Sequence, residues 1–241
     1  MNHAQPRCLF LHGFTGSAQD WLDCIGDDPD CLAIDLPGHG DAPDPTGGFE
    51  DAIQRLLERL PDSIDRLVGY SLGGRIALGL MQAAPRRFRA ATIISAHPGL
   101  TDPLIREQRR AADDQWIQLL RLQGIEAFVH AWERQPLFAS QRRLPSALLD
   151  RQRARRLSQR AEGLARSLEC FGLAGMPSLW DDLAQFSGQL RWIAGSEDPK
   201  FLYLGRQVAE QRPATDLRIL DGVGHNPILE APAILPDLFL R

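Results

Sequence analysis

Ser71 is the residue whose surroundings most directly predict chemistry. It lies in Gly69-Tyr70-Ser71-Leu72-Gly73, a G-x-S-x-G pattern that follows an apolar stretch and precedes a helix-forming one. This strand–turn–helix context places such a serine on a sharp, exposed turn. A side chain in place of Gly69 or Gly73 would crowd that turn. The pattern therefore predicts a reactive serine at the carboxyl end of a strand.

A serine hydroxyl reacts poorly until an imidazole takes its proton, and the imidazole needs a carboxylate to fix its tautomer. After Ser71 the chain offers Asp198, just beyond an apolar stretch, and then His225, just beyond the last apolar stretch. Serine, acid and histidine in this order form one of the known triad arrangements. We predict a catalytic triad of Ser71, Asp198 and His225, with Glu197 as the rival acid.

Each of these residues also has a purely structural interpretation. Ser71 could be an ordinary turn serine, although the flanking glycines argue against it. Asp198 could cap a helix that begins near Pro199, and His225 could be a surface histidine. We expect four other histidines to be structural or solvated: His3, His39, His97 and His130.

Catalysis by such a serine needs backbone N–H groups that stabilise developing negative charge. One is expected from Leu72, directly after the serine, and the other from the loop that follows the first strand. In that loop Phe14, after His12 and Gly13, is the best candidate. We expect His12 to brace the loop.

The elements that must position these residues are short apolar strands alternating with helices. Strands are predicted at 8–11, 31–35, 66–70, 90–95, 190–194 and 217–220, with helices at 49–60 and from the serine turn to about 84. This alternation predicts an α/β fold, a mostly parallel sheet with helices on both faces. The predicted triad residues all follow strands, where ligands bind in open parallel sheets.

The strand signal is absent between about residues 98 and 183. This stretch is helical and arginine-rich in pattern, and Pro136 and Pro145 interrupt it. We predict an inserted helical cap over 98–183 and a core formed by 1–97 and 184–241, within one domain. Residues 100–170 contain 13 Arg and 9 Asp plus Glu, a net charge of +4 in a chain of net charge −4.

Composition excludes several classes of protein. The 241 residues are 44% hydrophobic and 24% charged, and no apolar run reaches the roughly 18–20 residues of a membrane span. The net charge of −4 gives no basic patch for nucleic acid. The four cysteines have no C-x-x-C spacing, so neither a metal site nor a redox pair is expected. We expect a cytoplasmic protein without metal or cofactor, either monomeric or weakly homo-oligomeric.

Across its length the chain resembles the α/β-hydrolase superfamily. Within it, the chain is similar to the 2-succinyl-6-hydroxy-2,4-cyclohexadiene-1-carboxylate synthase family of menaquinone biosynthesis. The segments that carry this resemblance are 11–14 (LHGF), 35–40 (DLPGHG), 69–75 (GYSLGGR), 98–100 (PGL), 132–140 (WERQPLFAS), 198–201 (DPKF) and 224–226 (GHN).

The resemblance implies a carbon–oxygen lyase. Its substrate would be a small polyanionic metabolite, 2-succinyl-5-enolpyruvyl-6-hydroxy-3-cyclohexene-1-carboxylate, from which pyruvate is eliminated without water. Ser71, activated by His225 and Asp198, would abstract a ring proton. The resemblance further implies that the substrate is bound by Tyr70, Arg75, Arg106 or Arg109, Trp132, Phe138 and Arg156, with Arg109 preferred to Arg106.

The residues support part of this expectation independently. Arg75 follows Ser71 by four residues and so shares its helix face, and guanidinium groups bind carboxylates bidentately. Arg75 could instead pair with a surface carboxylate, and Trp132 could belong to the core of the cap. We expect Pro227 and the acidic pair Asp113-Asp114 not to touch the chemistry, although both could shift the pocket, and Lys200 to orient its loop or be exposed.

Two other functions fit the same sequence. A serine carboxylic-ester or thioester hydrolase would use the same triad, and a wholly apolar pocket would favour it. A ligand receptor without catalysis would not need Ser71, Asp198 and His225 together. Several buried arginines in a positive cap would favour the lyase.

Overall fold

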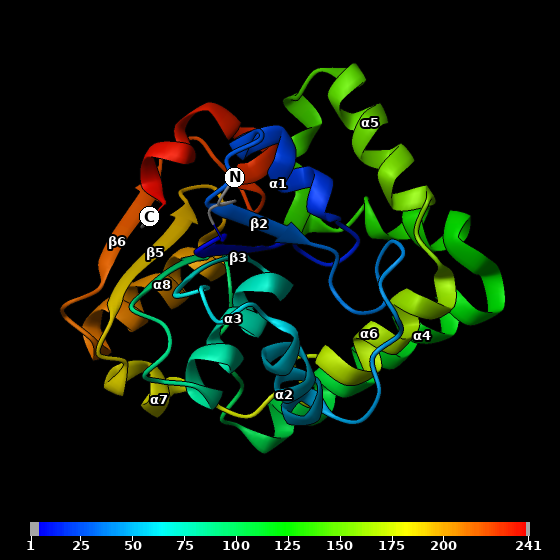
Figure 1. The fold of residues 1–241 in the computed structure, drawn as a ribbon. Helices are drawn as coiled ribbons and strands as arrows, with labels where there is room; N and C mark the ends of the chain where they lie inside the picture. Colours follow the sequence, from blue (N-terminus) through cyan, green and yellow to red (C-terminus); the bar gives the residue numbers. More distant parts are fainter. Residues whose placement is uncertain (1–4, 240–241) are drawn as a thin grey trace.

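The computed structural model describes residues 5–239 and shows a six-stranded parallel sheet at its centre (Figure 1). The strand order is β2-β1-β3-β4-β5-β6, and every neighbouring pair is parallel. The strands are β1 (Cys8–Leu11), β2 (Cys31–Ile34), β3 (Arg66–Tyr70), β4 (Ala90–Ile94), β5 (Gln189–Gly195) and β6 (Asp216–Leu220). The predicted α/β class is confirmed, and all six predicted strands are present.

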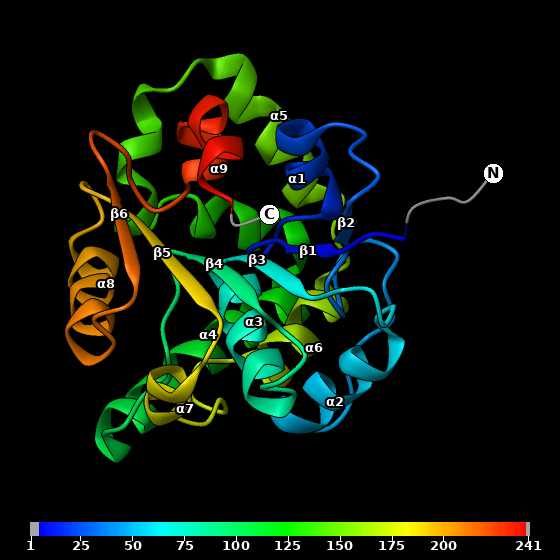
Figure 2. The same cartoon turned by 60° about the vertical axis from the view of Figure 1, so that its left-hand side comes forward.

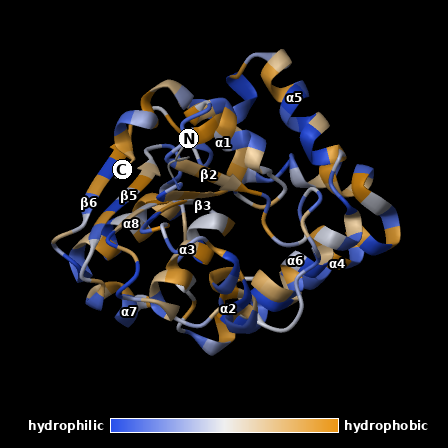
Figure 3. Cartoon of the chain, viewed as in Figure 1, coloured by the Kyte–Doolittle hydropathy of each residue, from blue (hydrophilic) through white to orange (hydrophobic). Residues whose placement is uncertain are grey.

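Helices cover both faces of this sheet (Figure 2). One face carries α1 (Ala18–Ile25) and α9 (Pro227–Glu230). The other carries α2 (Phe49–Arg59), α3 (Leu72–Ala83), α7 (Trp180–Gln185) and α8 (Pro199–Gln211). The chain ends in the short turns η2 (Pro232–Ile234) and η3 (Pro236–Leu238). Because a parallel sheet buried on both faces needs apolar side chains on both, the buried strands β1 and β4 are nearly continuous apolar runs, whereas the edge strand β6 alternates apolar and charged residues (Figure 3).

Successive side chains of β1 point to opposite faces of the sheet. Leu9 and Leu11 pack in the core cluster that contains α2 and α3, whereas Cys8 and Phe10 pack in the cluster that contains Trp21 of α1. All four β1 side chains are fully buried. The alternation follows from the period of two in a strand, and it fixes which face each connecting helix covers.

Between β4 and β5 the chain leaves the sheet and forms a helical cap, at the right in Figure 1. The cap contains α4 (Pro103–Trp132), the 3₁₀ segment η1 (Pro136–Arg143), α5 (Ser146–Leu157) and α6 (Ala161–Phe171). Gly124 breaks α4 with φ 80° and ψ −176°, a conformation that favours glycine. The cap has an apolar cluster of its own, formed by α4 and α6 around Phe128 and Leu164. The boundaries at 98 and 183 remain a prediction.

Candidate active site

The backbone places Ser71 on a strained turn at the end of β3. Its φ of 51° and ψ of −106° lie in a region that non-glycine residues rarely adopt. The turn is held because the Ser71 N–H donates to the Ile94 carbonyl at 2.9 Å. A Cβ atom on Gly73 would lie 2.1 Å from the Leu11 carbonyl oxygen, and one on Gly69 would lie 2.4 Å from the Gly73 carbonyl oxygen. Both glycines are therefore required for the helix to approach the sheet.

Two hydrogen bonds through His225 connect the three residues of the predicted triad. His225 Nε2 is 3.1 Å from Ser71 Oγ, and His225 Nδ1 is 2.6 Å from Asp198 Oδ2. Asp198 is 4% exposed and His225 is 3% exposed. A carboxylate at Nδ1 fixes the tautomer whose Nε2 can accept the serine proton, so the geometry suits proton transfer from Ser71.

Asp198 also caps a helix, so both interpretations of this residue hold. Its Oδ1 atom accepts the Phe201 N–H at 3.4 Å at the start of α8, while Oδ2 binds His225. This helix-capping hydrogen bond fixes the Asp198 rotamer that His225 needs. The rival acid Glu197 points elsewhere, because it is exposed and forms an ion pair with Arg143 at 2.7 Å.

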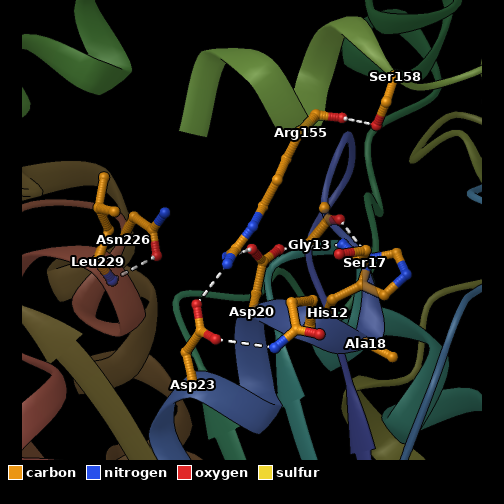
Figure 4. Close-up of polar contacts among 12 residues, drawn as sticks. His12, Gly13, Ser17, Ala18, Asp20, Asp23, Arg155, Ser158, Asn226 and Leu229 are labelled. Carbon is orange, nitrogen blue, oxygen red and sulfur yellow. Dashed lines mark hydrogen bonds and ion pairs between the residues drawn. The ribbon is translucent and has the colours of Figure 1, made fainter. Parts of the chain in front are cut away.

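Glu230 fixes the loop that carries His225, a role that sequence reasoning missed. Its carboxylate accepts the Gly224 N–H at 2.7 Å and the Asn226 N–H at 3.2 Å, one on each side of the histidine. Asn226 in turn caps α9 by accepting the Leu229 N–H at 3.3 Å (Figure 4). The sequence signal for this role was the presence of an acidic residue five positions after His225.

The loop after β1 and the residue after the serine both reach the cavity at Ser71. Phe14 and Leu72 both line the cavity at Ser71, and neither of their N–H groups has an acceptor within residues 5–239. His12 braces this loop as expected, since its Nδ1 donates to the Gly13 carbonyl at 2.7 Å and its Nε2 accepts the Leu36 N–H at 2.9 Å. Burial lowers the pKa of the His12 imidazole, so His12 is an uncharged brace.

His39 also holds the loop after β1, whereas the remaining histidines lie elsewhere. The His39 Nε2 atom accepts the Thr15 N–H at 3.2 Å. His130 contacts Arg134 at 3.0 Å on the outside of the cap. His3 lies outside the described residues. His97, which we expected to be structural or solvated, accepts the Gly99 N–H at Nδ1 at 3.0 Å and also lines the cavity.

A cavity of about 740 Å³ opens above Ser71 between the strand ends and the cap. Tyr70, Trp132 and Phe138 line it, as the resemblance implied. The ring of Phe138 lies 6.4 Å from that of His225, and the ring of Tyr70 lies 5.5 Å from it. Trp132 also stacks on Phe128 of the cap core, with centroids 5.3 Å apart. Trp132 is thus both a cap-core residue and a wall of the cavity.

Arg75 lines the cavity as a buried cation. It is 9% exposed, forms no ion pair within residues 5–239, and donates to the Phe171 carbonyl. Burial and the neighbouring Arg109 lower the pKa of Arg75 to about 9. A ligand carboxylate would stabilise such a buried cation, because their mutual attraction offsets the cost of removing the cation from water.

Arg156 and Arg109 also line the cavity, each with one carboxylate partner. Arg156 is 5% exposed, lies 3.2 Å from Glu133 and stands 5.1 Å from the centroid of the Phe138 ring. Arg109 binds Asp113 at 2.9 Å through Nε alone. The terminal nitrogens of Arg109 are therefore free of this carboxylate.

Arg106 and Asp113 take different places in the cap. Arg106 donates to the carbonyls of Leu100, Ala174 (2.9 Å) and Met176 (2.6 Å), and it is not among the residues that line the cavity. Arg106 therefore holds the start of α4, and Arg109 is the better candidate for substrate. Asp113, which we expected to influence the pocket without touching the chemistry, lines the cavity.

Charge gives the cavity its chemical character. The six cationic and three carboxylate side chains in its lining leave an excess of three positive charges: Arg75, Arg109, Arg151, Arg155, Arg156 and Lys200 against Asp20, Asp23 and Asp113. Within residues 5–239, no group of three or more His, Cys, Asp or Glu could hold a metal ion. None of the helices described is long and apolar enough to cross a membrane. The arrangement suits a small polyanion held over an activated serine.

Comparison with known proteins places the chain in a family. Residues 8–236 match the model of the alpha/beta hydrolase family. A 2-succinyl-6-hydroxy-2,4-cyclohexadiene-1-carboxylate synthase from Salmonella schwarzengrund is 35% identical over 243 residues, which cover 96% of this chain and 91% of the relative. A relative from Bacillus subtilis, provisionally named for the same activity, is 34% identical over 96% of this chain and 88% of its own.

Solved structures agree with these matches. The structure of MenH from S. aureus superposes with a TM-score of 0.90 at 29% identity, over 98% of this chain and 93% of that one. The enol-lactonase from Burkholderia xenovorans LB400 has a TM-score of 0.79 at 18% identity, over 99% of this chain and 92% of that one, and shares the fold alone. The chain therefore belongs to the alpha/beta hydrolase family and, within it, to the family of 2-succinyl-6-hydroxy-2,4-cyclohexadiene-1-carboxylate synthases.

Proposed function

We propose that this protein is a carbon–oxygen lyase of menaquinone biosynthesis. It converts 2-succinyl-5-enolpyruvyl-6-hydroxy-3-cyclohexene-1-carboxylate into 2-succinyl-6-hydroxy-2,4-cyclohexadiene-1-carboxylate and pyruvate. The observation that carries the proposal is Arg75, a buried cation without a counter-ion, one helical turn from the triad serine. The same proposal makes the protein a cytoplasmic enzyme whose partner is a small polyanionic metabolite, acting as a monomer or weak homo-oligomer.

The reaction follows from the bonds that differ between substrate and product. His225 takes the Ser71 proton, and Ser71 Oγ removes the ring proton next to the succinyl carbonyl. The electron pair shifts through the ring double bond and breaks the bond from carbon to the enolpyruvyl oxygen. The enolpyruvate that leaves takes up a proton on carbon and becomes pyruvate, so atoms and charge balance without water.

Backbone groups would stabilise the charge that develops during proton removal. The negative charge falls on the succinyl carbonyl oxygen, and the N–H groups of Phe14 and Leu72 are the candidates to bind it. Asp198 would stabilise the imidazolium form of His225. Arg75, Arg109 and Arg156 would hold the carboxylates, while Tyr70, Trp132 and Phe138 would enclose the ring.

The cation content of the cavity favours a lyase over an ester hydrolase. The lining side chains carry three positive charges in excess, and Glu133, outside the lining, pairs with one of these cations, Arg156. An acyl chain of an ordinary ester would leave the remaining cations unbalanced, whereas a substrate with three carboxylates supplies negative charge for them. Charge matching of this kind also speeds the encounter with an anionic substrate.

The test supplies the substrate with the preceding enzyme of the pathway and follows pyruvate release and diene absorbance. We expect Ser71→Ala to lower kcat by about 100- to 10,000-fold. Ser63→Ala is the matched control, because Ser63 lies before the amino end of β3 and its hydroxyl donates to the Pro6 carbonyl. A p-nitrophenyl ester serves as the alternative substrate. Ser71-dependent ester cleavage without pyruvate release would replace the lyase by a hydrolase.

A further inference from the structure

His97 occupies a position beside the reaction cavity that the proposed mechanism does not use. It follows β4, the strand whose Ile94 pairs with Tyr70, the residue before the triad serine. His97 lines the catalytic cavity and also a second cavity of about 680 Å³ between the start of α4, α7 and α8. Its ring therefore lies in the wall that separates the two.

Hydrogen bonding fixes the protonation state of this ring. The Gly99 N–H donates to His97 Nδ1 at 3.0 Å, so Nδ1 carries a lone pair and no proton. The proton of the neutral ring is therefore on Nε2. Burial lowers the pKa of His97 to about 4, and the nearby Lys200, Arg75 and Arg109 lower it as well. His97 is an uncharged donor at neutral pH.

The cations around His97 leave donor atoms free for a ligand. Arg109 uses only Nε for Asp113, and Arg75 uses Nη1 for the Phe171 carbonyl. Lys200 forms no ion pair in the described part of the chain and lines the cavity, with its Nζ atom 5.5 Å from the centroid of the Phe201 ring. Lys200 is the only lysine in a chain with 26 arginines. Lys200, which was expected to orient its loop or be exposed, is exposed and also lines the cavity.

We propose that His97 Nε2–H and the Lys200 ammonium complete, with Arg75 and Arg109, a subsite for one carboxylate of the substrate. A carboxylate offers about four acceptor positions, which donors from several side chains can share. The imidazole adds a directed donor without adding charge to a site that already holds three cations. The inference rests on the proposed function, because it assigns a substrate carboxylate to this end of the cavity.

The variants separate a donor role from a packing role. His97→Gln keeps an N–H donor and an acceptor for Gly99, whereas His97→Phe keeps the ring and removes both. We expect His97→Phe to raise KM for the enolpyruvyl substrate about tenfold with kcat reduced less, and His97→Gln to stay within about threefold of wild type. Lys200→Met should raise KM by a similar factor, and Lys200→Arg should restore most of the loss. Equal KM values for wild type and His97→Phe would overturn the proposal.

A readout that does not depend on turnover completes the test. Long-range ¹H–¹⁵N NMR of the full-length Ser71→Ala protein should show His97 as the Nε2–H tautomer at pH 7. Addition of the enolpyruvyl substrate should shift the Nε2 resonance. A protonated ring, the other tautomer or an unmoved resonance would contradict the subsite. If wild type releases no pyruvate, the proposed function fails. If pyruvate release is normal and His97→Phe is unaffected, only the subsite fails.

Discussion

Arg155 on α5 and Asp20 on α1 form an ion pair of 2.9 Å that joins the cap to the core beside the cavity (Figure 4). The same guanidinium binds Asp23, one turn further along α1. Asp20 also accepts the Ser17 N–H at 3.0 Å, so this carboxylate belongs to the start of α1. Since the residue after Arg155 is the buried Arg156, the ion pair holds a proposed substrate-binding side chain in register with the core.

Removal of this connection should weaken substrate binding more than chemistry. We expect Arg155→Gln to raise KM about three- to tenfold with kcat changed less, because the triad is not touched. Arg155 and Asp23 are partly exposed, so their coupling energy in a double-mutant cycle with Asp23→Asn should be about 0.5–1 kcal/mol. Hydrogen exchange of the α5 amides should accelerate in Arg155→Gln. Arg166→Gln, which removes exposed ion pairs within α6, is the control and should change neither KM nor exchange in α5.

Glu230 should affect kcat through the position of His225. Glu230→Ala leaves the Gly224 and Asn226 N–H groups without their acceptor, and a small displacement of a catalytic group can cost about 100-fold in rate. We expect kcat to fall about 10- to 100-fold in Glu230→Ala with KM nearly unchanged, and Glu230→Gln to recover part of the loss. The apparent pKa in the pH–rate profile should shift in Glu230→Ala. A profile and kcat identical to wild type would show that the loop keeps its shape without Glu230.

Gly73 should tolerate no side chain. A Cβ atom there would lie 2.1 Å from the Leu11 carbonyl oxygen, which belongs to the sheet and cannot move away. We expect Gly73→Ala to lower the free energy of unfolding by about 3 kcal/mol or more, or to prevent folding. In exposed Gly175 the nearest atom to such a Cβ is 3.6 Å away, so Gly175→Ala should stay within about 0.5 kcal/mol in urea titration. Equal stability of the two variants would refute the close approach of α3 to β1.

Stability should fall as the solution becomes acidic. Unfolded His97 takes up its proton near pH 6.5, whereas the folded pKa is about 4. Between these values the unfolded state binds more protons, so the free energy of unfolding increases with pH. We expect His97→Gln to reduce the loss of stability between pH 7 and pH 5 by about 1–2 kcal/mol. His12 and His39 also have lowered pKa values, so the variant should still lose some stability between pH 7 and pH 5. Urea titrations of both proteins at the two pH values provide the measurement.

The fold and the triad could be predicted because their signals are local. Strands 66–70 and 190–194 are apolar runs whose ends carry Ser71 and Asp198, and glycine framing marks the turn at Ser71. The roles of Glu230 and His97 could not be predicted, because they depend on which backbone groups come within reach after folding. Arg106 and Arg109 lie three residues apart on one helix, and no sequence pattern says which one meets the carbonyls of the loop before α7.

The insertion of the cap between β4 and β5 also determines the order in which the active-site residues are synthesised. Ser71 and the cap arginines emerge first, whereas Asp198 and His225 follow with the last two strands. A chain that stops after the cap has its nucleophile and its anion-binding side chains but no base to activate the serine. The nascent protein therefore lacks an activated serine until the loop that carries His225, after β6, has been made.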